Sequence, residues 1–181
     1  PEVETMCRGI ACFRGEVIAT TQFPQLTQRP SPIHPRPKTM AAKLHHARIL
    51  DITRLGKRAV LRIRKNEDDM DSFLVFEPRM TGLLLRVSPP THQHVRLIVK
   101  TKQKHPLIFW DRRGLGTITL FDKPTFESRF GSHAIGPDAL IISGHTLYER
   151  IRSSRRHIKV ALLDQKILAG VGNIYASEIL H

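Results

Sequence analysis

A β-prone region from about residue 49 to 121, which contains six short segments of this kind, limits the possible folds of this chain more than any other feature. Each is bounded by glycine, proline or polar residues: 58–65 (RAVLRIRK), 71–78 (DSFLVFEP), 82–87 (GLLLRV), 94–100 (HVRLIVK), 106–110 (PLIFW) and 116–121 (GTITLF). In the first, Ala59, Leu61 and Ile63 alternate with a largely basic set, which is the period of a half-buried strand. Short strands at close intervals predict an antiparallel sandwich or barrel. The acidic run 66–71 between the first two is predicted to be a hairpin loop.

The segments that precede this β-prone region have other patterns. Ile10, Cys12 and Phe13 recur at roughly helical spacing, and a β-prone tail follows them up to residue 20. Residues 28–39 contain four prolines, which fix φ and remove backbone donors. This proline-rich segment is therefore predicted to be an extended surface connection rather than a helix or a central strand.

Beyond about residue 125 the pattern becomes helical. Residues 135–141 are predicted to be a linker, and 143–154 is predicted to be a helix. In the following segment, 155–166, spacings of i, i+3, i+4 and i+7 run from Ile158 to Gln165 and predict a second amphipathic helix.

A glycine-rich turn, LAGVGN, follows the second predicted helix. Gly170 and Gly172 would allow the chain to turn through positive φ, and Asn173 is predicted to be the N-cap of a last helix, IYASEIL. A helix start of this kind offers free backbone N–H groups and the positive end of a dipole. The turn is thus a candidate phosphate site.

Charge and composition narrow the classes of partner. Lys and Arg number 29 against 16 Asp and Glu, which gives a net charge of +13. This surplus favours a polyanionic partner over a merely basic soluble protein. No apolar run is long enough to span a membrane. Cys7 and Cys12 are too few for a disulfide framework or a four-ligand zinc site, and nothing supports His92 and His94 as a metal pair, so no metal site is predicted.

Several motifs in this order resemble the formamidopyrimidine-DNA glycosylase family, which includes the endonuclease VIII branch. They are PEVET, RGI, RLGKR, EPRMTG, DRRGLG and IKVALLDQKILAGVGNIYASEILH. The resemblance implies an α+β fold: an antiparallel β-sandwich with flanking helices (1–127), a linker (128–140) and part of a helix–two-turn–helix domain (141–181). It implies double-stranded DNA with oxidised bases or abasic sites as the partner, with no membrane association. It also implies a monomer and, in a bacterium, a cytoplasmic, nucleoid-associated location.

The family chemistry implied by the resemblance is covalent catalysis by an N-terminal proline amine. The amine attacks C1′ of the damaged nucleotide, expels the base and leaves an iminium ion, and elimination then breaks the DNA strand. In register, Pro1 and Glu2 match an inner proline and glutamate of the family opening, so the chain is expected to be a fragment without the nucleophile. A re-created start with Pro1 as nucleophile is the alternative. The family's zinc finger is also absent, so no cofactor is expected here and one zinc ion is expected in the full-length parent.

Two residues of the β-prone region, Lys57 and Met80, match family residues that contact the DNA beside the lesion. Lys57 in RLGKR matches a hairpin lysine that contacts a phosphate, and it is the only catalytic-site candidate besides Pro1 and Glu2. Met80 in EPRMTG matches the methionine that fills the gap of the flipped base, and its turn-like surroundings predict exposure.

The DRRGLG loop matches the family loop that inserts opposite the lesion. Arg113 matches the arginine that hydrogen-bonds the orphaned base, and Leu115 stands where the family usually has phenylalanine. Gly114 replaces a residue that is commonly basic, and Asp111 is predicted to be a structural anchor of the loop rather than a catalyst.

In the helical part, Asn173 matches the asparagine that holds a phosphate next to the lesion. Gly172 would let the backbone come close to that phosphate, and Lys159 matches a lysine near the same site. The leading function is a bifunctional glycosylase and abasic-site lyase for oxidised purines such as formamidopyrimidine and 8-oxoguanine. An endonuclease VIII-type enzyme for oxidised pyrimidines and a non-catalytic DNA-binding protein of the same fold remain as alternatives.

Overall fold

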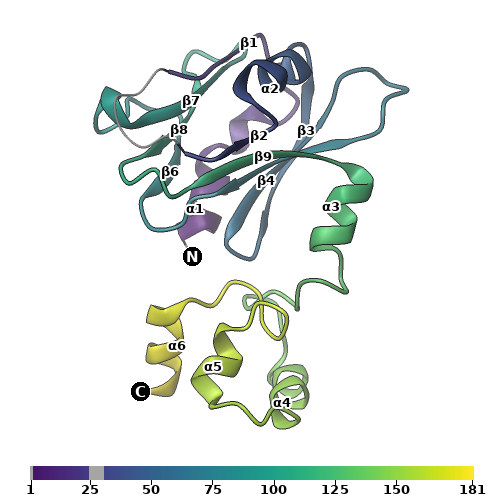
Figure 1. Ribbon diagram of the computed structural model, residues 1–181, viewed down its shortest axis with the longest axis vertical. Coiled ribbons are helices and arrows are strands. Elements are labelled where there is room, and N and C mark those ends of the chain that lie inside the picture. Colours follow the sequence, from purple (N-terminus) through teal and green to yellow (C-terminus); the bar gives the residue numbers. More distant parts are fainter. Residues whose placement is uncertain (1, 25–30) are drawn as a thin grey trace. The chain divides into compact units, whose positions relative to one another are not determined.

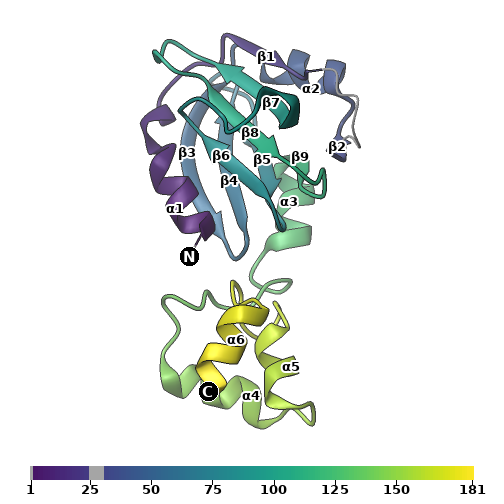
Figure 2. The same ribbon diagram turned by 90° about the vertical axis from the view of Figure 1, so that its left-hand side faces the viewer.

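The chain forms two compact units, which are described one at a time. The computed structural model describes residues 2–24 and 31–181 (Figures 1 and 2). The first unit runs up to Arg54 and includes Arg58–Lys123, and the second consists of Leu55–Lys57 with Pro124–His181. The boundaries expected at residues 127 and 140 stay predictions.

The first unit contains two β-sheets. The five-stranded sheet has the order β2 (Ile33–His34), β9 (Thr117–Asp122), β5 (Ser72–Glu77), β4 (Arg58–Arg64) and β3 (Arg48–Leu55). The four-stranded sheet has the order β1 (Thr20–Gln22), β7 (Val95–Lys100), β8 (Leu107–Asp111) and β6 (Gly82–Leu85). Strand β2 pairs parallel with β9, whereas β5 runs antiparallel to β9 and β4, and β8 runs antiparallel to β6 and β7.

The core lies between the two sheets and confirms the predicted sandwich within an α+β fold (Figure 2). Leu61 and Leu74 of the five-stranded sheet and Leu97 of the four-stranded sheet are fully buried in one cluster. Phe76 and Phe109 meet across it with ring centroids 5.4 Å apart. All six predicted strand segments form strands, and the acidic run 66–71 is the loop of the β4–β5 hairpin, as predicted.

Helices in the first unit differ from the predicted pattern. The N-terminal helix α1 (Glu2–Gly9) lies earlier than predicted, and Ile10, Cys12 and Phe13 lie in and beside a short 3-10 turn, η1 (Ala11–Phe13). Ile10 and Phe13 are nonetheless fully buried, because this turn also directs them into the core. A second 3-10 turn, η2 (His92–His94), precedes β7.

The prediction of an extended connection over residues 28–39 is wrong in its second half. Part of it, up to residue 30, lies outside the described residues, but β2 adds a two-residue strand to the sheet edge, where a neighbouring proline costs no ladder bond. Helix α2 (Pro37–Leu44) then begins at a proline. The first turn of a helix leaves its N–H groups unpaired, so proline is tolerated there.

The second unit contains the helical segments. Helix α3 (Lys123–Phe130) leads into it, followed by α4 (Gly144–Arg152), α5 (Ile158–Leu163) and α6 (Asn173–Leu180). The predicted helix at 143–154 is confirmed, and Ser143 caps it by accepting a hydrogen bond from Thr146 N at 3.1 Å. The small hydrophobic core of the second unit comprises Leu162, Leu168, Val171 and Ala176.

The second predicted helix, 155–166, is shorter than the pattern suggested. Helix α5 ends at Leu163, so Gln165 does not lie on its face, and Ile158 at its start is half exposed. The segment 136–139, within the predicted linker, pairs with 165–169: Ala139 N donates to Ala169 O, and Gly136 N donates to Gln165 O, each at 2.9 Å. Within the described part of the chain, no helix is both long and apolar enough to cross a membrane.

Candidate nucleic-acid interface

A tight turn after β5 presents Met80 to solvent. The turn is closed by Gly82 N, which donates to Pro78 O at 2.9 Å, and Arg79 adopts a positive φ of 56°. A Cβ at Gly82 would lie 2.5 Å from Pro78 O, so only glycine fits this turn. Met80 is 73% exposed, as expected, and its role as a wedge stays a prediction.

Asp111, at the end of β8, organises the loop that follows it. Its side chain is fully buried. One carboxylate oxygen accepts hydrogen bonds from the Thr81 hydroxyl (2.5 Å) and from Arg113 N (3.2 Å), and the other accepts from Gly116 N (2.7 Å). Gly114 lies between these contacts at a φ of 62°. These contacts agree with the expectation that Asp111 is a structural anchor.

The same hydrogen bonds join the Met80 turn to the Arg113 loop. The Thr81 hydroxyl, adjacent to Met80, donates to Asp111 and accepts from Arg113 N at 3.1 Å. Arg113 is exposed and Leu115 is half-buried. The structure therefore brings together two of the loops that the sequence singled out, and it leaves their long side chains accessible.

Two further residues that support these loops were missed at the sequence level. Arg96 of β7 is buried, and its Nε donates to Asp111 O at 2.9 Å. Burial lowers the pKa of Arg96, and the nearby charge of Asp111 opposes this shift. Glu77 accepts from Arg58 Nε at 2.6 Å and from Arg79 Nη2 at 2.9 Å. A charged residue inside an apolar strand, as in HVRLIVK, is the signal that could have identified Arg96.

In the second unit, Lys57 lies next to the glycine-rich turn. Gly56 precedes it with a φ of 59°, and a Cβ at Gly56 would lie 3.5 Å from Gly170 N. The Lys57 Nζ atom lies 3.5 Å from the position that a Cβ at Gly172 would take. Lys57 and Gly172, which are 115 positions apart in the chain, are thus neighbours.

The side chain of Gln165 holds the glycine-rich turn in shape. Its Nε2 donates to Val171 O at 3.0 Å and to Leu163 O at 3.1 Å, and its Oε1 accepts from Gly170 N at 3.0 Å. Sequence periodicity assigned Gln165 to a helix face, which is wrong because α5 ends before it. Its role as an internal clamp has no local sequence signal.

The prediction that Asn173 is the N-cap of the last helix is also wrong. Gly172 is the N-cap, in extended backbone with φ −114°, and Gly172 O accepts the first helical bond from Ala176 N at 2.8 Å. Asn173 is therefore the first helical residue and is exposed. Of the two glycines, only Gly170, at φ 104°, uses positive φ.

Lys159 reaches the first turn of α6 through a serine. Its Nζ donates to Ser177 Oγ at 2.9 Å, and Ser177 Oγ donates to Asn173 O at 2.9 Å. The amine is therefore one side chain away from the helix start. Lys57, Lys159, Gly172 and Asn173 all belong to the second unit, so this group of candidates is assembled within it.

The N-terminal candidates have a different setting. Pro1 lies outside the described residues, and Glu2 is the exposed first residue of α1. Two residues further along α1, hydrogen bonds from Arg8 and Arg54 lower the pKa of Glu4. In the same helix, burial raises the pKa of the Cys7 thiol to about 11.

The described residues do not fit a zinc ion. Across residues 2–24 and 31–181, no group of three or more His, Cys, Asp or Glu side chains is arranged to hold a metal. Cys7 is buried in the core, whereas Cys12 is exposed.

The protein consists of a β-sandwich followed by a helical unit that contains a glycine-rich turn. It therefore belongs to the class of proteins in which a β-sandwich precedes a helix–two-turn–helix domain. Residues 1–118 match the formamidopyrimidine-DNA glycosylase N-terminal domain, and residues 135–181 match the H2TH domain of the same glycosylase. The chain belongs to the formamidopyrimidine-DNA glycosylase family.

Individual relatives and solved structures agree with this assignment. The formamidopyrimidine-DNA glycosylases of Chloroflexus aurantiacus and Hahella chejuensis share 34% and 33% sequence identity with this chain. Each alignment covers 99% of this chain, and the chain spans only 63% and 64% of the two relatives' lengths. The Lactococcus lactis Fpg in complex with abasic-site DNA has a TM-score of 0.79 and 29% identity, with 99% of this chain and 65% of that one covered. A complex of the same bacterium's Fpg with FAPY-dG DNA has the same TM-score and identity, with 99% and 66% covered.

Proposed function

We propose that this chain binds duplex DNA at an oxidised base or abasic site, as part of a bifunctional DNA glycosylase and abasic-site lyase for oxidised purines such as formamidopyrimidine and 8-oxoguanine. The observation that carries this proposal is the joined pair of loops that present Met80 and Arg113 from one buried carboxylate, Asp111. An enzyme that acts on a base must first remove that base from the stack. Loops held rigidly beside the lesion can occupy the vacated position, which suits a member of this family.

The joined loops suit the cost of base flipping. Extruding a base costs a few kcal/mol, and an apolar wedge in the vacated position replaces part of the lost stacking. Met80 is exposed at the tip of its turn and can supply that wedge. Arg113 can donate hydrogen bonds to the orphaned base, with Leu115 as a weaker second wedge than the usual phenylalanine.

The second unit suits the phosphates beside the lesion. Lys57 supplies an amine next to Gly172, which has no side chain to block a phosphate oxygen. The first-turn N–H groups of α6 and the Asn173 side chain offer donors, and Lys159 adds a positive charge. These contacts carry no sequence information, so they fix position and raise affinity for every duplex.

The lyase chemistry requires a nucleophilic amine and a carboxylate for proton transfer. We assign these roles to the family's N-terminal proline and glutamate, with Pro1 and Glu2 of this chain as the alternative pair. The proposal extends to one zinc ion in the longer parent and to a monomer that acts on nucleoid DNA in the bacterial cytoplasm.

Binding and trapping together test the proposal. Duplexes of one sequence, intact or with a central tetrahydrofuran, 8-oxoguanine or thymine glycol, are titrated with the chain at several salt concentrations. We expect the tetrahydrofuran duplex to bind at least tenfold more tightly than the intact one, with affinity that falls as salt rises. Equal affinity for both would refute recognition of the lesion.

Borohydride trapping on an abasic duplex then decides between the enzyme and its alternatives. A trapped adduct supports the lyase, and excision of 8-oxoguanine rather than thymine glycol supports the purine specificity over the endonuclease VIII-type alternative. Selective binding without any adduct would refute Pro1 as the nucleophile. It would establish the non-catalytic DNA-binding alternative only if the chain extended by the family's N-terminal proline and glutamate also gave no adduct. An adduct mapped to Pro1 would assign the nucleophile to this chain itself.

A further inference from the structure

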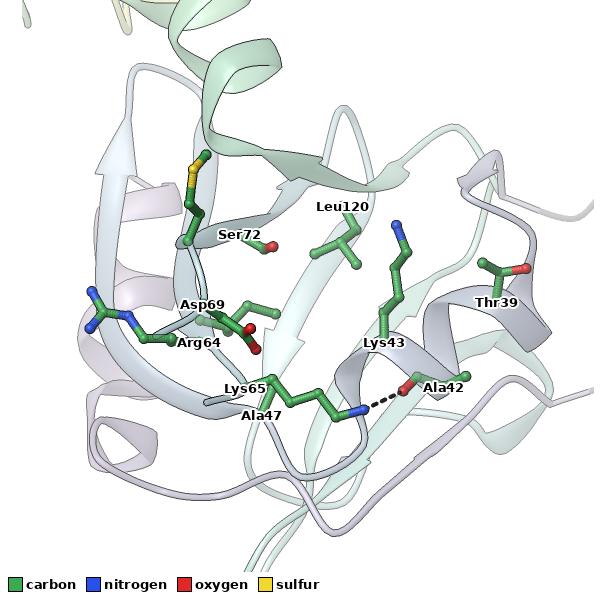
Figure 3. A pocket seen from close by; sticks show the side chains of 11 residues that line it. Thr39, Ala42, Lys43, Ala47, Arg64, Lys65, Asp69, Ser72 and Leu120 are labelled. Atoms are coloured by element: carbon green, nitrogen blue, oxygen red, sulfur yellow. Dashed lines mark hydrogen bonds between the residues drawn. The ribbon is translucent and has the colours of Figure 1, made fainter. Parts of the chain in front are cut away.

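A pocket of about 470 Å³ opens at one end of the sandwich, under helix α2 (Figure 3). Its walls come from α2, the end of β4, the acidic hairpin loop, the first residue of β5 and the middle of β9. Its size lies within the range of pockets that enclose a ligand or a side chain. Figure 3 shows Leu120 and Ser72 in the space bordered by Lys43 and Asp69.

The pocket is remote from the Met80 turn within the same unit. Ser72, which lines the pocket, is the first residue of β5, and Glu77, which precedes the Met80 turn, is the last. Six residues of strand place these two ends about 17 Å apart. A ligand in this pocket would therefore leave the candidate DNA loops of the sandwich uncovered.

The floor of the pocket is apolar and its rim is polar. Ala47 and Ile63 belong to the hydrophobic core, Leu120 packs against it, and all three line the pocket. On the lip, Met70 is 64% exposed. An unbranched, flexible thioether adapts to different apolar partners, so an exposed methionine beside an apolar floor suits a site that receives a side chain.

The charges on the rim are unevenly matched. Arg64 donates to Asp71 at 2.7 Å, so this pair is neutralised. Asp69 accepts from Asn66 N at 3.0 Å, a neutral donor, and keeps its charge. In the described part of the chain, neither Lys43 nor Lys65 has a carboxylate partner, and Lys65 Nζ donates a hydrogen bond to Ala42 O at 3.5 Å.

We propose that this pocket docks a short segment of a partner protein in which one apolar side chain lies between acidic residues. The apolar side chain would occupy the floor formed by Ala47, Ile63 and Leu120, and flanking carboxylates would pair with Lys43 and Lys65. Two unmatched amines beside an apolar opening are complementary to such a segment. The apolar floor offers no hydrogen-bond donor to a phosphate, which disfavours a nucleic-acid backbone at the same place.

Fluorescent peptides and one pair of charge reversals test this docking site. The probe is a capped peptide with a central leucine between two pairs of aspartates, and fluorescence anisotropy measures its binding to the chain. Lys43→Glu should weaken binding by about tenfold, because it replaces an attractive contact with a repulsive one. Lys38→Glu is the matched control: it lies on the same helix and makes the same charge change, but it does not line the pocket. Binding in this control should fall less than threefold.

Several outcomes would overturn the proposal. These are no binding at millimolar peptide, an equal loss in the two variants, or equal binding when alanine replaces the central leucine. Binding of hexanoate with the same Lys43 dependence, but no binding of the peptide, would identify a small-ligand site instead. Duplex binding that falls more in Lys43→Glu than in Lys38→Glu would place this surface on DNA. The peptide assay contains no DNA, so its outcome does not depend on the proposed glycosylase function.

Discussion

Replacing Asp111 by asparagine should destabilise the sandwich and disconnect its two exposed loops. The carboxylate is fully buried, and its two oxygens accept hydrogen bonds from the Thr81 hydroxyl, Arg113 N and Gly116 N. Asparagine has one acceptor oxygen and one donor group in the same shape. If the amide oxygen of asparagine faces Thr81, its NH₂ group faces the N–H of Gly116. In the parent, the Gly116 N atom lies only 2.7 Å from the carboxylate oxygen Oδ2 of Asp111.

The magnitude follows from the bonds that are lost. A hydrogen bond to a charged group contributes about 1.5–3 kcal/mol, and a buried donor left unsatisfied costs about 1–3 kcal/mol. Asp111→Asn loses one such bond and sets two donors against each other, so a loss of about 3 kcal/mol in the free energy of unfolding is expected. With a urea m-value of about 2 kcal/mol/M, the midpoint should fall by about 1.5 M.

Urea unfolding followed by the fluorescence of Trp110 measures this change, because Trp110 is the only tryptophan and lies next to Asp111 in β8. Asp68→Asn is the matched control: it removes one negative charge from the exposed β4–β5 loop and should change the unfolding free energy by less than about 0.5 kcal/mol. If Asp111→Asn falls within 0.5 kcal/mol of the parent, Asp111 does not anchor these loops.

Four further predictions concern the glycine-rich turn, the two thiols and the DNA contact of Asn173. By circular dichroism, Gly170→Ala should destabilise the second unit by about 1–2 kcal/mol because its φ is 104°, whereas Gly172→Ala at φ −114° should change it by less than about 1 kcal/mol; equal effects would contradict the assigned backbone. N-ethylmaleimide at pH 8 should modify exposed Cys12 rapidly and buried Cys7 slowly, and two equally fast thiols would show that Cys7 is not enclosed. The pKa of the Cys7 thiol is raised to about 11, so its contribution to the free energy of unfolding is fully present below the thiol's unfolded pKa near 9 and is lost as pH rises towards 11. The difference in urea midpoint between the parent and Cys7→Ala should therefore change between pH 9 and pH 11, and a constant difference would contradict this. Asn173→Ala should weaken binding to all duplexes alike, and unchanged affinity and salt slope would refute its phosphate role.

Local patterns were sufficient to predict most strands of this fold. Each β-prone segment has its own period and its own boundary residues, so no knowledge of distant parts was needed. The two-residue strand β2 could not be found in this way, because its pairing with β9 joins residues 85 positions apart, Ile33 and Ile118. Helix α2 does not follow from the sequence pattern, because the prolines before it favour an extended chain, although Pro37 at its first position is compatible with a helix.

The exposed residues of the candidate site could be predicted from the sequence, but most of the buried side chains that hold their turns in shape could not. Family register located Met80 and Lys57, and the structure places each at a turn. Gln165 fixes the glycine-rich turn through three hydrogen bonds to backbone groups. These bonds depend on α5 ending two residues earlier, a boundary that the apolar period alone did not give.

This division has a physical cause that bears on how variants of the protein should be interpreted. An exposed side chain such as Met80 contributes little to folding, so its identity is free to be set by its ligand. A buried polar side chain such as Asp111 or Gln165 satisfies several backbone groups at once, and its loss moves every residue on the turn that it holds. Substitution of these two residues should therefore alter DNA binding without any direct contact to DNA. It can be distinguished from loss of a contact residue because stability falls together with affinity.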